Sequence, residues 1–137
     1  MRFLDTNVIL RYLTRDDEAR AAACYELFQR VQRQEEELAT CEAIVAEVVY
    51  VLSSPRLPYR LNADQIRARL LPILMLRGLK LSHKRVCLRA LDVYASSPPL
   101  DFEDALAVAH MEQLGITRIV SYDRDFDHVA GLHRIEP

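Results

Sequence analysis

Apolar residues along this chain follow two different spacings, and the changes between them predict where strands and helices lie. Short apolar runs that end in polar residues predict strands at 1–4, 38–40, 79–81, 116–121 and 132–135. Apolar residues at helical spacing predict helices at 18–33, 42–52, 62–76, 84–95 and 102–114, with 8–13 as a helix or a turn. Because strands and helices alternate, we expect one α/β domain over residues 1–137, with a mostly parallel sheet and helices on both of its faces.

Local signals mark where several of these elements begin and end. Asp16 or Asp17 can cap the helix at 18–33, and Asn62 with Gln65 has the spacing of a capping box. Segment 42–52 is rich in valine, which favours a strand, but its length and a cap at Thr40 favour a helix. Pro72 should kink or split its helix, and Gly115 should end the helix before it.

Composition narrows the class of protein. With 137 residues, half of them hydrophobic, and a net charge of -2, we expect one compact domain without a broad basic surface. Cys24, Cys41 and Cys87 lie far apart, which argues against a disulfide framework or a cysteine zinc site and fits a reducing cytoplasm. Asp5 interrupts the apolar start expected of a signal peptide, and no apolar stretch reaches membrane-spanning length.

Four acidic residues stand in apolar surroundings. Asp5 and Asp123 each follow a predicted strand, and ligands of parallel sheets bind at the carboxyl ends of strands. Glu47 lies within the apolar segment 43–52 and Asp104 at the start of an apolar helix, so we expect both to be buried. A buried carboxylate must be neutral, paired or bound to a metal. Pairing with a buried arginine is the alternative for Glu47, and helix-start chemistry is the alternative for Asp104.

The chemistry that four such acids support is metal binding. Oxygen ligands suit Mg²⁺ or Mn²⁺, and ions held this way activate water in phosphodiester hydrolysis. Asp101 is the better helix cap and is assigned to that role. Asp125 and Asp127 follow Asp123 at alternate positions, but a calcium loop is excluded because it lacks the required glycine and glutamate. Asp127 either reaches the same site or is a solvated loop acid.

Other enzyme classes lack their motifs. The chain has no glycine-rich phosphate loop, no G-x-S-x-G and no H-E-x-x-H, and its four histidines are scattered. Arg11, Arg56 and Arg60 lie near the proposed site and are candidates for contacts with phosphates of the substrate, although plain solvated surface also explains them.

Four motifs stand in order along the chain: LDTNV at 4–8, AEV at 46–48, DFEDALA at 101–107 and VSYDRDF at 120–126. Together they resemble the motifs of the PIN domain and, within that family, the VapC toxins of bacterial toxin–antitoxin pairs. The resemblance covers the whole chain. Ser121 stands where the family often has threonine, which keeps the hydroxyl.

The resemblance implies a fold, an activity and partners. It implies a five-stranded parallel sheet between helices, in an Mg²⁺- or Mn²⁺-dependent endoribonuclease that cleaves single-stranded RNA with metal-activated water. By motif, the catalytic and metal-holding acids are Asp5, Glu47, Asp104 and Asp123, with Thr6, Asn7 and Ser121 as supporting polar groups. It also implies a homodimer that is held inactive by a cognate antitoxin.

Two other hypotheses compete with the hypothesis of a nuclease. Phosphatases of the haloacid-dehalogenase type also place an aspartate after the first strand, but they need a second aspartate two residues on, where this chain has Asn7. A PIN-like binding module, whose acids serve a structural metal or a partner's arginines, requires no catalysis.

Overall fold

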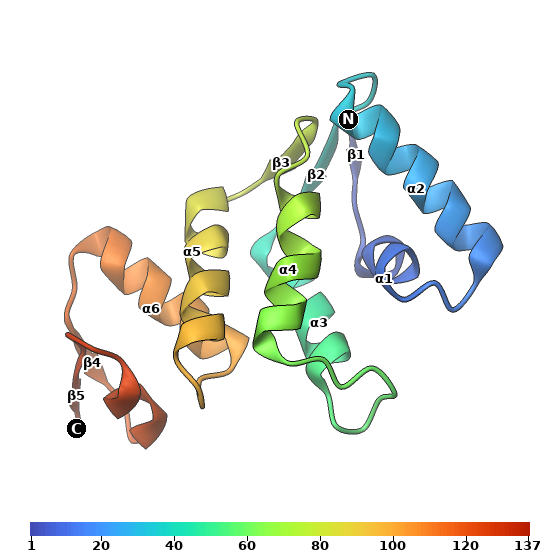
Figure 1. Ribbon diagram of the computed structural model, residues 1–137. Coiled ribbons are helices and arrows are strands. Elements are labelled where there is room, and N and C mark those ends of the chain that lie inside the picture. Colours follow the sequence, from blue (N-terminus) through green and yellow to red (C-terminus); the bar gives the residue numbers. More distant parts are fainter. The chain divides into compact units, whose positions relative to one another are not determined.

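The computed structural model describes residues 1–137, which form two compact units, Met1–Lys84 and Arg85–Pro137. The chain contains six α-helices, five strands and one 3-10 helix, in the order drawn in Figure 1. All strand pairs are parallel, with the order β1-β2-β3 in one sheet and β4-β5 in the other. The α/β class and the five mostly parallel strands are therefore confirmed. None of the helices has the length and the apolar character needed to span a membrane.

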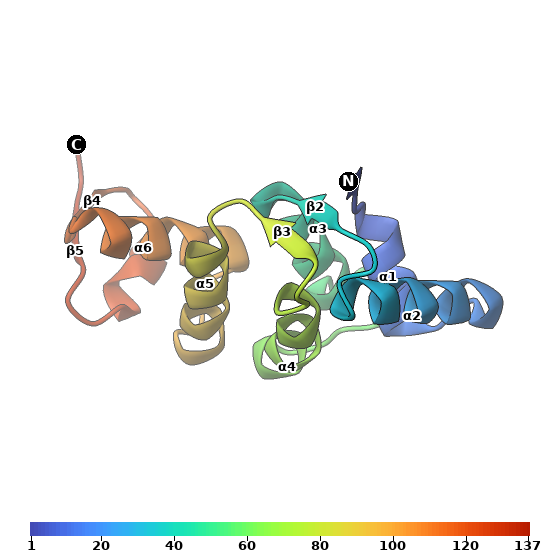
Figure 2. The same cartoon turned by 90° about the horizontal axis from the view of Figure 1, so that it is seen from above.

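The first unit is built around its three short strands. The strands are β1 (Arg2–Phe3), β2 (Leu38–Thr40) and β3 (Leu79–Leu81). Helices α1 (Thr6–Thr14) and α2 (Glu18–Gln32) connect β1 to β2, and α3 (Glu42–Ser53) and α4 (Ala63–Leu74) connect β2 to β3. Figure 1 shows α1 beside α2, and Figure 2 shows β3 next to α4. The buried core of this unit includes Ile9, Val31, Val45, Leu52, Ile66 and Leu70.

The second unit combines two helices with a two-stranded sheet. Helix α5 (Lys84–Ser96) leads into it and is followed by α6 (Phe102–Leu114), β4 (Arg118–Val120), η1 (Arg124–His128) and β5 (His133–Ile135). The ring of Tyr94 on α5 meets Phe102 on α6 edge to face, with 5.9 Å between the ring centroids. Strands β4 and β5 pair in register, with Val120 opposite Ile135. Helix α6 thus lies between α5 and the segment that carries Asp123.

The predicted helix ends are mostly confirmed. The side chain of Asp17 accepts a hydrogen bond from the backbone N–H of Arg20 and caps α2. Asn62 and Gln65 form a complete capping box at the start of α4. Gly115 ends α6 in the left-handed conformation, at a φ of 69°. These ends were predictable because each depends on residues within one helical turn.

The predicted cap at Thr40 is wrong, and of the two effects expected of Pro72, a kink or a split, the split does not occur. Thr40 does not cap α3, whose N-cap is Cys41, because the hydroxyl of Thr40 donates instead to the carbonyl oxygen of Leu4 at 3.1 Å. Pro72 does not split α4, which continues through it and ends two residues later at Leu74. The carbonyl that loses its partner at Pro72 belongs to the exposed Ala68, where water can replace the missing bond.

Candidate active site

In the first unit, Asp5 lies between a strand and a helix. It directly follows Leu4 at the end of β1 and occupies the N-cap position of α1, with φ -92° and ψ 161°. Its side chain makes no capping hydrogen bond and is exposed. The carboxylate is therefore available for a ligand.

Glu47 is connected to the residue that follows Asp5. The hydroxyl of the buried Thr6 donates a hydrogen bond of 2.7 Å to Oε2 of Glu47, which lies on α3. The backbone N–H of Leu4 also donates to the carbonyl oxygen of Ala39 at 2.7 Å, so the end of β1 is held to β2. The first unit thus brings Thr6, which directly follows Asp5 in the chain, into contact with Glu47.

The expected burial of Glu47 is wrong, because its side chain is exposed. Helix α3 buries Val45, Val48, Val49 and Leu52 on one face and exposes Ala43, Glu47 and Tyr50 on the other. The three exposed positions are spaced by four and three residues, so they share one side of the helix. No buried arginine pairs with Glu47, and its hydrogen-bond donor is the hydroxyl of Thr6.

In the second unit, acidic residues crowd around the start of α6. Asp101 accepts a hydrogen bond from the backbone N–H of Asp104 at 2.8 Å, so it is the helix cap, as predicted. Asp104 is half-buried, whereas the sequence predicted that it would be buried. Burial, followed by the nearby charges of Asp101, Asp123 and Asp125, raises the pKa of Asp104 to about 6. The structure therefore brings Asp104 and Asp123 close enough to interact.

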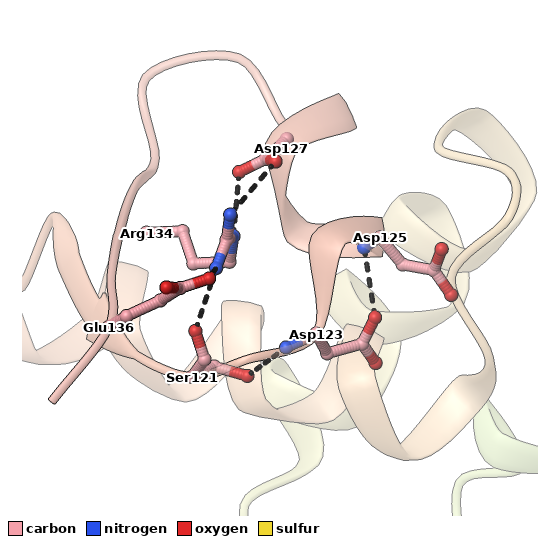
Figure 3. Close-up of polar contacts among 6 residues, drawn as sticks. All are labelled: Ser121, Asp123, Asp125, Asp127, Arg134 and Glu136. Atoms are coloured by element: carbon pink, nitrogen blue, oxygen red, sulfur yellow. Dashed lines mark hydrogen bonds and ion pairs between the residues drawn. The ribbon is translucent and has the colours of Figure 1, made fainter.

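A turn after β4 presents Asp123 and Asp125 together (Figure 3). The backbone N–H of Asp123 donates to Oγ of Ser121 at 3.0 Å, and the backbone N–H of Asp125 donates to Oδ1 of Asp123 at 2.9 Å. Asp127 faces a different partner, because both of its oxygens accept from Arg134, at 2.9 and 3.4 Å. The structure therefore assigns Asp127 to the packing of this turn rather than to the group of acids around Asp104.

Comparison with known proteins identifies the family. The model of the PIN domain family matches residues 2–132. The chain belongs to the PIN domain family. Proteins with this domain are typically nucleases that use divalent metal ions.

Among solved structures, this PIN domain is similar to VapC20 of Mycobacterium tuberculosis, a toxin that cleaves the sarcin-ricin loop. The two chains are 18% identical, the match covers 100% of each, and the TM-score is 0.39. None of the curated proteins matches the chain by sequence.

The acidic side chains of this PIN domain carry the kind of donor atom that a hard divalent cation prefers. No three histidine, cysteine, aspartate or glutamate side chains lie together in an arrangement that could hold an ion. In the first unit the carboxylate of Glu47 accepts from the hydroxyl of Thr6, and in the second unit Asp104 lies near the carboxylates of Asp101, Asp123 and Asp125. Burial and then these negative charges raise the pKa of Asp104, and a cation would neutralise the charges. Asp5 and Glu47 can supply ligands from the first unit, and Asp104 and Asp123 from the second.

Two residues that had no predicted role belong to the site in the second unit. Asp125 contributes to the negative charge at Asp104, and Arg134 holds Asp127, Glu136 and the backbone of Ser121. A signal for Arg134 exists in the sequence, because an arginine within the predicted last strand needs acceptors nearby. Which acceptors it finds depends on the pairing of β4 with β5.

The candidate RNA contacts lie in two places of the first unit. Arg11 lines a groove of about 370 Å³ between α1 and α2, together with Asn7, Val8, Arg20, Ala23 and Cys24. Arg56 and Arg60 are exposed on the connection between α3 and α4. The hydroxyl of Tyr59 on that connection donates to Asp16, and this bond raises the pKa of Tyr59. The connection is therefore fastened to the chain between α1 and α2.

Proposed function

We propose that this protein is a metal-dependent endoribonuclease that hydrolyses phosphodiester bonds in single-stranded RNA. Asp5, Glu47, Asp104 and Asp123 act together on Mg²⁺ or Mn²⁺, with Thr6, Asn7 and Ser121 in support. The observation that carries the proposal is the match of the PIN domain family to residues 2–132, which includes all four acids. The carboxylates gathered at Asp104 support it independently.

The two compact units are, in this proposal, parts of a single PIN-like domain over residues 1–137. The family match crosses the boundary between Lys84 and Arg85 without interruption.

Each carboxylate has a defined task. Asp5 occupies the N-cap position of α1, but its carboxylate oxygens make no capping hydrogen bond. Thr6 orients Glu47. Ser121 holds the backbone of Asp123, while Asp101 occupies the cap and leaves Asp104 for the ion. When bound, the divalent ion would supply a Lewis acid that activates water and stabilises charge at the phosphate.

The groove between α1 and α2 suits the phosphate backbone of the substrate. Arg11 is half-buried in the groove and forms no ion pair, so its guanidinium is free to bind an anion. Arg20 lies on the opposite wall, 3.3 Å from Asp17. Asn7 stands two residues after Asp5 and lines the same groove, so a strand bound at Asp5 can continue past Arg11. Arg56 and Arg60 are the remaining candidate contacts.

A cognate antitoxin, a homodimer and a cytoplasmic location complete the proposal. Their support is the resemblance of the four motifs to VapC toxins. The acids of the site would attract a basic segment of an antitoxin, since arginine pairs well with carboxylates.

The activity is tested with a fluorescently labelled single-stranded RNA. We expect cleavage with Mn²⁺ and none with EDTA, and we expect Asp5→Asn to lower the rate by more than about 100-fold because a metal ligand is lost. Asp64→Asn makes the same chemical change at an exposed position on α4 and should leave the rate unchanged. Full activity in Asp5→Asn would contradict the proposal, and binding of RNA without any cleavage would favour a PIN-like binding module.

The RNA contact is tested separately, with Asp5→Asn as the background so that the RNA stays intact. Arg11→Gln should weaken binding and reduce the slope of log K against log salt by about 0.7, as expected for one lost phosphate contact in single-stranded nucleic acid. Arg69→Gln removes an exposed arginine from α4 and serves as the control. Equal salt slopes in the two variants would show that Arg11 does not contact a phosphate of the RNA.

A further inference from the structure

Arg134 on β5 connects three parts of the second unit. Its side chain is only 13% exposed. Nε donates to Oδ1 of Asp127 on η1 at 2.9 Å, and Nη1 donates to Oε1 of Glu136 at 3.0 Å and to the carbonyl oxygen of Ser121 at 3.0 Å. Figure 3 shows the guanidinium between these groups. A planar guanidinium can reach several acceptors in this way, whereas an ammonium group is a single point of charge.

The contact with Ser121 matters because Ser121 also holds Asp123. The carbonyl oxygen of Ser121 accepts from Arg134, and its hydroxyl oxygen accepts from the backbone N–H of Asp123. Oδ1 of Asp123 in turn accepts from the backbone N–H of Asp125. Hydrogen bonds therefore connect the arginine on β5, through Ser121, to the carboxylate of Asp123 and the backbone of Asp125 after β4 (Figure 3).

The ion pairs of Arg134 do not explain its position by themselves. Asp127 and Glu136 have side chains that are 50% and 52% exposed, and ion pairs at this exposure add little to the stability of a fold. The carbonyl of Ser121 is the acceptor on the strand that leads into the acidic turn. What Arg134 adds to this turn is chiefly a fixed geometry.

We propose that Arg134 is a positioning residue: by binding the carbonyl of Ser121, it fixes the turn that presents Asp123 and Asp125. Asp127 and Glu136 also accept hydrogen bonds from the guanidinium. The expected effect on metal affinity rests on the proposed function, in which Asp123 holds the metal ion. The expected effect on the geometry of the turn does not depend on that function. Residues that orient metal ligands typically affect metal affinity by about 10-fold to 100-fold.

The test compares the full-length protein with Arg134→Gln, Arg134→Lys and Asp127→Asn. Mn²⁺ dissociation constants are measured by calorimetry at a temperature where every variant is folded, and amide hydrogen exchange is measured at Asp123 and Asp125. We expect Arg134→Gln to weaken Mn²⁺ binding by about 10-fold to 100-fold and to accelerate both exchange rates. Asp127→Asn removes an ion pair but keeps the contact between Arg134 and Ser121. The Mn²⁺ affinity of this variant should stay within about 3-fold of the wild type, a smaller change than the one expected for Arg134→Gln.

Arg134→Lys keeps the charge and therefore separates charge from geometry. It should restore the stability lost in Arg134→Gln but not the slow exchange at Asp123 and Asp125. Wild-type exchange and wild-type Mn²⁺ affinity in Arg134→Lys would overturn the proposal, and this variant also serves if Arg134→Gln does not fold. If the wild type itself binds no Mn²⁺, the proposed function fails, and the exchange rates alone decide the role of Arg134.

Discussion

The hydroxyl of Thr6 donates a hydrogen bond of 2.7 Å to the carboxylate of Glu47, although the two residues are 41 positions apart. Because Thr6 begins α1 and directly follows Asp5, this bond connects the two acids that the first unit contributes to the proposed site. Glu47 is exposed, so the bond does not compensate for burial. Its effect is to orient one oxygen of Glu47 and leave the other available.

Thr6→Val tests this role with a side chain of nearly the same shape. The loss of the hydroxyl should lower the free energy of unfolding by about 1 kcal/mol, because Glu47 can bind water in place of Thr6. Mn²⁺ affinity should fall by about 10-fold or more, as for other residues that orient metal ligands. Urea unfolding and calorimetry measure the two effects. Thr6→Ser keeps the hydroxyl, and equal Mn²⁺ affinity in the valine and serine variants would contradict this role.

The charge around Asp104 can be changed without disturbing its helix. Asp101→Asn should preserve the cap of α6, because asparagine caps helices as well as aspartate does. The pKa of Asp104, raised to about 6 by burial and by neighbouring carboxylates, should then fall, since one negative neighbour is gone. A carbon-detected NMR titration of the Asp104 carboxyl group measures the change.

Glu103→Gln is the control for that titration. Glu103 lies next to Asp104 in the first turn of α6, but it is exposed and is not among the charges that raise the pKa of Asp104. We expect the pKa of Asp104 to stay unchanged in this variant. Equal shifts in Asp101→Asn and Glu103→Gln would mean that Asp101 has no specific effect.

The stability of the protein should depend on pH through the same carboxyl group. In the folded chain the pKa of Asp104 is about 6, above the value of roughly 3.9 for an unfolded chain. The folded state therefore binds the proton more tightly, and the contribution of Asp104 to stability is lost as pH rises from about 4 to about 6. Urea unfolding in EDTA should show a smaller decrease across this range in Asp104→Asn. Parallel pH profiles for the variant and the wild type would refute the prediction.

The sequence predicts features that depend on neighbouring residues. Asp17, Asn62 and Asp101 act as helix caps because their partners lie three residues away, and Gly115 ends α6 for an equally local reason. The order of strands and helices also follows from the spacing of apolar residues. The family resemblance was visible in the sequence because its four motifs each occupy a short run of residues.

Contacts between distant segments are what the sequence does not predict. The hydroxyl of Thr40 can cap a helix or bind the carbonyl of Leu4, and only the pairing of β1 with β2 decides in favour of the latter. The abundance of apolar residues on α3 does not reveal that Glu47 lies on its exposed side. Arg134 likewise acquires its role through the pairing of β5 with β4, which places it beside Ser121.

We propose that Asp5 and Asp104 are both needed to bind the divalent ion, and Mn²⁺ binding by calorimetry tests this proposal most directly. The wild type is compared with Asp5→Asn from the first unit and Asp104→Asn from the second, with Asp64→Asn as the control. We predict that each of the two site variants alone abolishes tight Mn²⁺ binding, whereas the control binds as the wild type does. Mn²⁺ binding that survives unchanged in either site variant would contradict the claim.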